Sequence, residues 1–132
     1  MFFLLSQFVH RITRGSQFGC CVVAAFNTEL VLIGLHAKPD YAVEEMIALE
    51  NVHTAVKQHW NTDNIIIMGD LNAECRYASL PELEGLNIRK DPFCWLIGDG
   101  VDTTVYSTDC AYDRCAWHSV QITGGAVAPA LC

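Results

Sequence analysis

The chain has 132 residues, of which 52% are hydrophobic and 17% charged, and its formal net charge is −7. This length accommodates one domain with a real core, and the composition excludes a disordered chain. No apolar run reaches the roughly 18 residues that suggest a membrane-spanning helix. The acidity argues against a storage or scaffold role on nucleic acid, because surfaces that grip many phosphates are cationic. It leaves room for an enzyme in which bound cations offset the negative field.

The opening residues, Met1–Val9, are apolar, as in the core of a signal peptide. They lack a basic leading region, and no small-residue cleavage site stands out before Arg11. Two alternatives therefore stay open: the end of a signal peptide, and a non-native or truncated start.

Two strands, a helix and a third strand are predicted in the first half of the chain. Gly19–Phe26 and Glu29–His36 are apolar and β-branched, and we expect the second to be buried on both faces. Pro39 then opens a helix that runs to about Trp60. Its predicted apolar stripe consists of Val43, Ile47, Val52, Val56 and Trp60. Asn64–Met68 is a short apolar run typical of a central strand, so this order predicts a crossover unit.

The chain beyond Asp70 is predicted to be rich in loops. Prolines and glycines punctuate it at Pro81, Gly85, Pro92, Gly98 and Gly100. Ala111–Ile122 is a candidate for one further strand. The fold class is therefore α/β with a buried sheet, and we expect active groups where strands end.

Seven cysteines are many for a cytosolic enzyme. The sequence contains no C-x-x-C pair, so a zinc site is not favoured. Cys75 and Cys110 lie in loop contexts beside polar residues, which predicts an oxidising compartment and at least one disulfide. Small buried hydrophobes are the alternative, and they suit Cys20, Cys21 and Cys94. The pairing of Cys20, Cys21, Cys94, Cys115 and Cys132 cannot be predicted.

The segment Ile65–Cys75 carries the most chemical information. A buried strand runs into Gly69, and Asp70 and Asn72 follow at its end. Asp70 can hold a hydrated Mg²⁺, and Asn72 can donate to a phosphate oxygen without repelling it. An Asx turn that closes a strand would use the same residue types.

Other candidate residues lie at further strand ends and loops. His36 ends a buried strand and could donate to a phosphate or exchange protons, or could be an ordinary strand-end histidine. Asp102, Thr104 and Thr108 could bind Ca²⁺ or form a polar turn. Asp113 lies on an apolar strand and needs a partner, either a catalytic histidine or Arg114.

The segments LIGLHAKP, IIIMGDLNAEC, WLIGDGVDTT and CAYDR, in this order, resemble the deoxyribonuclease I family of the endonuclease/exonuclease/phosphatase superfamily. The resemblance runs from about Phe18 to Arg114. It implies a four-layered α/β sandwich, part of which this chain would form. It also implies a hydrolase that cuts DNA phosphodiesters with Mg²⁺ or Mn²⁺ and Ca²⁺, as a secreted monomer. A nuclear location is the alternative.

The resemblance also implies roles for single residues. His36 matches one of two catalytic histidines, Asp70 and Asn72 match residues near the scissile phosphate and metal, and Asp113 matches the carboxylate that orients the second histidine. Asp102 and Thr104 match the loop that holds a structural calcium, with Thr108 just beyond it. Other matches concern a disulfide (Cys75–Cys110) and aromatics against the DNA backbone (Tyr77 and Tyr112).

The departures from the family pattern are equally specific. The metal-binding glutamate, the glutamate that pairs with His36 and the minor-groove residues of the family's N-terminal half have no match before Phe18. The family's second catalytic histidine, in a Ser-Asp-His stretch, has none either, and His118 does not replace it. We therefore expect residues 1–132 to form a single partial domain, family-like over 18–114 with a divergent tail over 115–132. The alternative to a nuclease is an inactive remnant or partner-binding half-domain.

Overall fold

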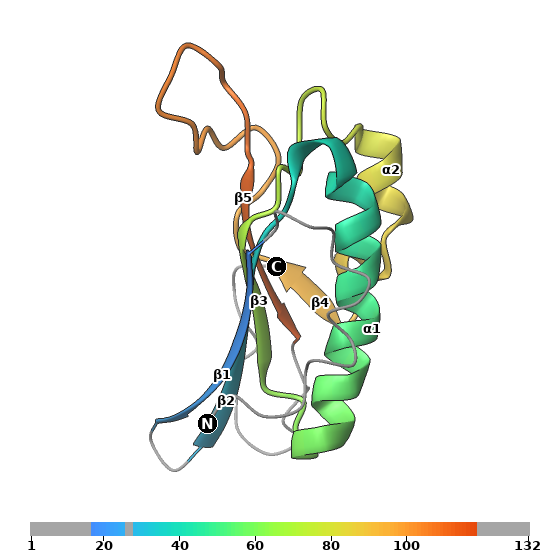
Figure 1. Ribbon diagram of the computed structural model, residues 1–132, viewed down its shortest axis with the longest axis vertical. Helices are drawn as coiled ribbons and strands as arrows, with labels where there is room; N and C mark the ends of the chain where they lie inside the picture. The colour runs from blue at the N-terminus through green and yellow to red at the C-terminus, as the bar shows by residue number, and fades with distance from the viewer. Residues whose placement is uncertain (1–16, 26–27, 119–132) are drawn as a thin grey trace.

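The protein contains one mixed β-sheet with helices packed on it (Figure 1). The computed structural model describes residues 17–25 and 28–118. Five strands pair in the order β1-β2-β3-β5-β4. Their bounds are β1 (Gln17–Ala25), β2 (Thr28–His36), β3 (Ile65–Asp70), β4 (Phe93–Trp95) and β5 (Asp113–His118). The helices are η3 (Pro39–Tyr41), α1 (Ala42–Trp60), α2 (Leu80–Gly85) and η4 (Asn87–Arg89).

The predicted crossover unit is confirmed, because β2 and β3 are parallel and α1 connects them. The predicted stripe on α1 is partly wrong. Ile47 is 47% exposed, whereas Val52 and Val56 are buried. The buried face of α1 consists of Ala42, Glu45, Met46, Ala48, Leu49, Val52, His53 and Val56. Because this face includes a glutamate and a histidine, the positions of the apolar residues alone do not identify it.

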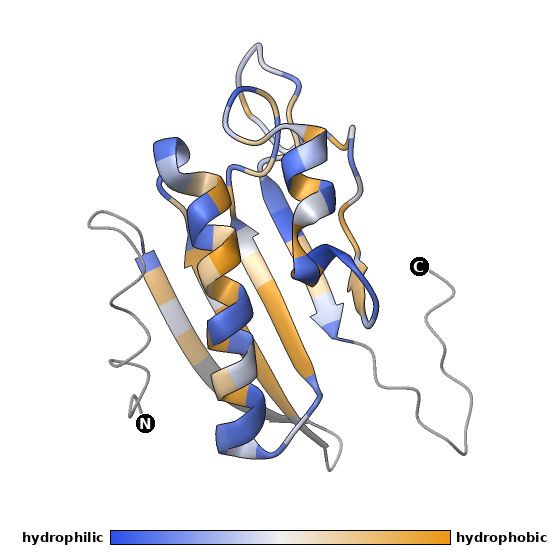
Figure 2. Cartoon of the chain, turned by 90° about the vertical axis from the view of Figure 1, so that its right-hand side faces the viewer, coloured by the Kyte–Doolittle hydropathy of each residue, from blue (hydrophilic) through white to orange (hydrophobic). Residues whose placement is uncertain are grey.

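One face of the sheet carries the core. Inward-facing side chains of β2 and β3 are almost fully buried, and so is Leu49 of α1. These strand residues are Val31, Ile33, Leu35, Ile65 and Ile67. Figure 2 shows both α1 and α2 in front of the sheet. Successive side chains of a strand point to opposite faces, so the residues between these buried ones point to the face of the sheet that lies away from the helices.

The opposite face of the sheet is only half-buried within the described part of the chain. Leu32 and Ile66 are intermediate in exposure, and Met68 is 37% exposed. The expectation that Glu29–His36 is buried on both faces is therefore wrong for the residues whose burial is described. The apolar sequence of β2 and β3 reflects their central place in the sheet, where the described residues supply a helical layer on one side.

Three short elements lie in the region predicted to be loops: α2, η4 and β4. A capping box starts α2, in which Ser79 and Glu82 satisfy each other's backbone donors. Pro81 was interpreted as loop punctuation, yet it occupies the first turn of α2, where its missing N–H costs no helical bond. Elements of three to six residues are too short for periodicity to reveal.

The last described strand, β5, begins at Asp113, two residues later than predicted, and residues 119–122 of the predicted strand lie outside the described part. The fold class is α/β, as predicted, with one sheet and one helical layer of a partial sandwich. No helix among the described residues is long and apolar enough to cross a membrane.

Candidate active site

Three of the predicted site residues form one row across the end of the sheet. Asp70 of β3 pairs with Asp113 of β5 in the antiparallel register. β2 and β3 run parallel with Gly34 beside Met68, which places His36 beside Asp70. Directly paired residues point to the same face of a sheet. His36, Asp70 and Asp113 therefore share the face that the helices leave uncovered.

His36 and Asp70 are in electrostatic contact. His36 Nε2 lies 3.6 Å from Asp70 Oδ2, and their side chains are 58% and 38% exposed. This exposure leaves both groups accessible to a substrate. It also means that solvent screens their attraction, so the contact orients the groups more than it stabilises the fold.

Gly69 and Asn72 give the end of β3 its shape. Gly69 has φ 137°, and a Cβ there would lie 2.1 Å from the Leu35 carbonyl oxygen, so β2 and β3 approach each other closely at this point. The Asn72 N–H donates to Asp70 Oδ1 over 3.1 Å, which forms the Asx turn given as the alternative above. This turn fixes the Asp70 carboxylate relative to the backbone.

The Asn72 side chain is buried, and its Nδ2 donates to the Ala37 carbonyl over 3.0 Å. It thereby ties the residue after His36 to the turn after Asp70. Asn72 therefore lies buried below the row, and one of the two hydrogens of its side-chain amide is already donated to Ala37. The expected donation to a phosphate depends on the other hydrogen.

Arg114 is not the partner of Asp113. It lies on the helical face, where its Nη2 is 3.1 Å from Asp99 Oδ1 and 2.9 Å from the Ala73 carbonyl oxygen. Burial lowers the pKa of the Arg114 guanidinium, and the charge of Asp99 opposes that effect. Neighbouring strand residues point to opposite faces, so Arg114 could not reach its neighbour's carboxylate. Among the described residues, no side chain hydrogen-bonds or ion-pairs with the Asp113 carboxylate.

The predicted calcium residues hydrogen-bond one another. Asp102 Oδ1 accepts from the Thr104 N–H over 2.8 Å and from Thr104 Oγ1 over 2.7 Å, and Thr104 Oγ1 also donates to the Thr108 carbonyl. The hydrogen bonds from Thr104 hold the pKa of Asp102 below its usual value. The three residues do come together, in a polar turn whose oxygens are partly satisfied without a cation.

The expected disulfide between Cys75 and Cys110 is present, with its Cα atoms 6.0 Å apart. Glu74, which the sequence does not single out, adds hydrogen bonds between the same two loops. Its carboxylate accepts from the Ala111 N–H and, over 3.3 Å, from the Gly100 N–H. Its position inside the segment Ile65–Cys75 was the only signal in the sequence.

Tyr77 and Tyr112 lie side by side, with ring centroids 5.6 Å apart. The Arg76 guanidinium lies 4.7 Å from the centroid of the Tyr77 ring. Tyr112 directly precedes Asp113 in the chain, so this small basic and aromatic surface lies at the same end of the sheet as the row. Stacked aromatic and guanidinium groups are typical of surfaces that contact a nucleic-acid backbone.

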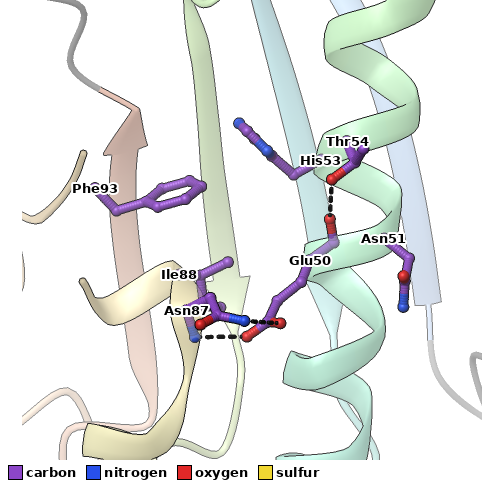
Figure 3. A pocket seen from close by; sticks show the side chains of 7 residues that line it. All are labelled: Glu50, Asn51, His53, Thr54, Asn87, Ile88 and Phe93. Carbon is purple, nitrogen blue, oxygen red and sulfur yellow. Dashed lines mark hydrogen bonds between the residues drawn. The ribbon is translucent and has the colours of Figure 1, made fainter. Parts of the chain in front are cut away.

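One cavity of about 250 Å³ lies elsewhere, between α1, η4 and β4 (Figure 3). It is lined by Glu50, Asn51, His53, Thr54, Asn87, Ile88 and Phe93. These residues do not include any member of the row. The row is the stronger candidate site, because its groups are the ones that chemistry on a phosphate can use.

The fold and this row define an α/β domain that carries its polar groups where the strands of a sheet end. The chain belongs to the endonuclease/exonuclease/phosphatase family, whose sequence profile matches residues 2–126. It is 48% identical to deoxyribonuclease-1-like 2 of Mus musculus over 94 residues, which cover 70% of this chain and 34% of that protein. It is also 44% identical to deoxyribonuclease gamma of Homo sapiens over 101 residues, 75% of this chain and 33% of that protein.

The chain thus spans about a third of the length of the curated relatives that it matches. The fold is similar to the crystal structure of a humanized D. rerio TDP2 with 14 mutations, with a TM-score of 0.56 and 15% sequence identity. The aligned part covers 89% of this chain and 48% of that structure. At this identity the likeness concerns the fold alone.

Proposed function

We propose that this chain is part of a divalent-metal-dependent endonuclease that hydrolyses DNA phosphodiester bonds. The observation that carries the proposal is the row of His36, Asp70 and Asp113 on one face, at the end of three adjacent strands. The names of its relatives, deoxyribonuclease-1-like 2 and deoxyribonuclease gamma, support the same activity.

In this proposal the row handles protons and charge around one phosphate. His36 exchanges a proton with a phosphate oxygen or with the attacking water, and Asp70, 3.6 Å away, orients its ring. Asn72 holds the turn that aims Asp70. The reaction forms a bond from a water oxygen to phosphorus and breaks the bond from phosphorus to the leaving oxygen. We expect 3′-hydroxyl and 5′-phosphate ends.

Nucleases of this family are generally dependent on divalent metal ions. Such an ion, here Mg²⁺ or Mn²⁺, would offset the negative charge that builds on the phosphate. The described residues do not fit a complete site, because no three His, Cys, Asp or Glu side chains among them could hold a metal ion together. Asp70 is the candidate for one ligand.

The turn of Asp102, Thr104 and Thr108 is the proposed Ca²⁺ position, where Asp102 Oδ2 and backbone carbonyls are the available ligands. Its internal hydrogen bonds already hold the turn. We therefore propose a supporting role for Ca²⁺, in which it stiffens a loop that the disulfide also anchors.

Tyr77 and Tyr112, with Arg76, are the proposed contacts to the DNA backbone. The disulfide Cys75–Cys110 supports a secreted protein or one of the secretory pathway, since such bonds persist in oxidising compartments. We propose that the protein acts as a monomer.

A plasmid-nicking assay with Mg²⁺ or Mn²⁺ and with Ca²⁺ tests the activity. We expect slow nicking by this chain alone, because the described residues offer an incomplete ligand set and no imidazole to Asp113. Groups that cooperate in catalysis lose most of their effect together, so the rate of nicking should be lower than that of a complete enzyme by far more than a few fold. Full-length mouse deoxyribonuclease-1-like 2 serves as the reference.

The variants Asp70→Asn and His36→Gln should abolish the residual nicking, whereas Asp109→Asn, at an exposed loop position, should leave it unchanged. Nicking that survives Asp70→Asn would contradict the proposal. Complete absence of nicking in the wild-type chain would favour the second candidate, a non-catalytic half-domain. The incomplete ligand set is the observation that favours this candidate.

A further inference from the structure

Two buried histidines join α1 to β5, far from the row of the candidate site. His53 Nε2 lies 2.9 Å from His118 Nδ1, and both side chains are more than nine-tenths buried. Phe93 of β4 packs on both rings, edge-on to His53 at 4.7 Å and stacked on His118 at 5.1 Å. His118 is the last described residue of β5 and pairs with Ile65 of β3.

Hydrogen bonding between two imidazoles requires one donor and one acceptor nitrogen. Burial, together with the neighbouring His118 and Lys57, lowers the pKa of His53 to about 4, against the opposing charge of Asp63. Burial is also the largest cause that lowers the pKa of His118, with Asp63 opposing and Lys57 assisting. Both rings are therefore neutral at pH 7 and can form the bond.

The charged groups that face the pair come from α1 and from the turn before β3. Asp63 Oδ1 lies 3.8 Å from His118 Nδ1, and Lys57 forms an ion pair with the same carboxylate. Phe93 of β4 and Ile65 of β3 bring no charge. Glu50 lies one turn before His53 on α1, but its carboxylate accepts from the backbone and side chain of Asn87. Among the described residues Asp63 is thus the nearest anion, and Lys57 largely neutralises it.

We propose that the His53–His118 contact is an acid-sensitive tie, which holds the end of β5 against α1 at neutral pH and breaks on acidification. A first proton places a charge among apolar groups, where it is poorly solvated. A second proton makes both facing nitrogens donors, so that they repel each other. The cavity in Figure 3 is lined by His53, which gives water and protons a route to the pair.

The tie also bears on the candidate site. β5 is held at one end by this contact and carries Asp113 at the other. Loosening of His118 weakens the pairing of β5 with β3, and with it the register that places Asp113 beside Asp70. Acidification therefore disturbs the row through the strand that carries Asp113.

Stability measured against pH tests the tie. The unfolded chain binds protons at an ordinary histidine pKa near 6.5, and folded His53 binds them near 4. Protonation therefore favours unfolding between these values, so the stability that the tie contributes is complete above about pH 6.5 and is lost as the pH falls toward 4. We expect the folding equilibrium constant to fall on the order of a hundredfold between pH 7 and pH 4.5 through this pair.

The double variant His53→Phe with His118→Phe keeps aromatic packing on Phe93 and should lose this part of the pH dependence in urea unfolding. The control variant His59→Phe changes an exposed histidine of the same helix and should retain it. An unchanged pH profile in the double variant would overturn the proposal.

A measurement on the wild-type protein stands even if the double variant does not fold. Histidine ring resonances followed by NMR should show His53 staying neutral down to about pH 5 and His118 titrating below the ordinary histidine pKa. Hydrogen exchange, corrected for its intrinsic pH dependence, should show β5 losing protection before β2 does. Ordinary titration of both histidines near pH 6.5, or equal loss of protection along the sheet, would refute the tie.

Discussion

Gly69 shows how one missing side chain sets the geometry of the candidate site. Its φ of 137° and the 2.1 Å that would separate a Cβ from the Leu35 carbonyl oxygen leave no room for any other residue. β2 and β3 can therefore approach closely just before His36 and Asp70. The contact of these two side chains depends on a residue that has no side chain.

We predict that Gly69→Ala destabilises the protein by roughly 3 kcal/mol, because it adds backbone strain to a clash with a main-chain atom that cannot move aside. Urea unfolding followed by circular dichroism gives the value. Gly98→Ala is the matched control, since a Cβ at Gly98 would meet nothing within 4 Å and its φ is not positive. Equal midpoints for the two variants would show that the close approach of the strands is not essential.

At the scale of elements, the segment between β4 and β5 owes its position to covalent and polar anchors. The disulfide joins Cys110 to Cys75, and Glu74 binds the backbone of the same loop at Ala111 and Gly100. No helix or strand lies between Trp95 and Asp113. A loop of this length without such anchors would retain much more freedom in the folded state.

We predict that replacing both cysteines (Cys75→Ser with Cys110→Ser) costs about 3–4 kcal/mol, because the bond closes 35 residues in the unfolded chain. Equilibrium unfolding without reductant measures the loss. Cys115→Ser, outside this loop, is the control and should change the midpoint little. A loss below about 1 kcal/mol would mean that Glu74 and the turn at Asp102 hold the loop unaided.

The sequence predicts long elements well and short ones poorly. The strands around Gly34 and Ile67 and the helix to Trp60 were identified from runs of apolar residues, and the crossover followed from their order. The apolar stripe was misassigned at Ile47, since Glu45 and His53 occupy the buried face. For α2, η4 and β4 the local signal spans too few residues.

The sequence predicts which residues make up the candidate site, but it does not predict their hydrogen-bond and ion-pair partners. The resemblance located His36, Asp70 and Asp113, and their common row follows from strand register, which no single segment encodes. The partners of Arg114 and Asn72 could not be predicted, because Asp99, Ala73 and Ala37 are brought to them by tertiary structure. The same holds for His53 and His118, which are 65 positions apart.

At the scale of the whole molecule, a net charge of −7 opposes contact with DNA. Proteins that bind DNA through many cationic side chains release counterions and weaken steeply as salt increases. This chain has eight Lys and Arg against fifteen Asp and Glu, so it cannot gain affinity in that way. Divalent cations, which neutralise both surfaces, should decide whether it binds.

We predict that the chain binds a DNA duplex weakly in EDTA and measurably better with Mg²⁺ or Ca²⁺, with only a shallow dependence on monovalent salt. Fluorescence anisotropy with a labelled duplex measures both effects. The variant Arg76→Gln, at the proposed contact surface, should reduce the binding seen with divalent ions, whereas Lys90→Gln should not. Tight binding in EDTA with a steep salt dependence would contradict this prediction.

The pairing of Asp70 with Asp113 has a consequence for which changes the chain can accept. Side chains alternate along a strand, so deleting one residue inside β5 would replace the carboxylate at this position with a guanidinium or a phenol ring and remove one of the two carboxylates of the row. An insertion in the loop before it, between the anchors at Asp102 and Cys110, would shift no register at all. Length variation among natural or engineered versions of this chain should therefore be concentrated in that loop and absent from β5.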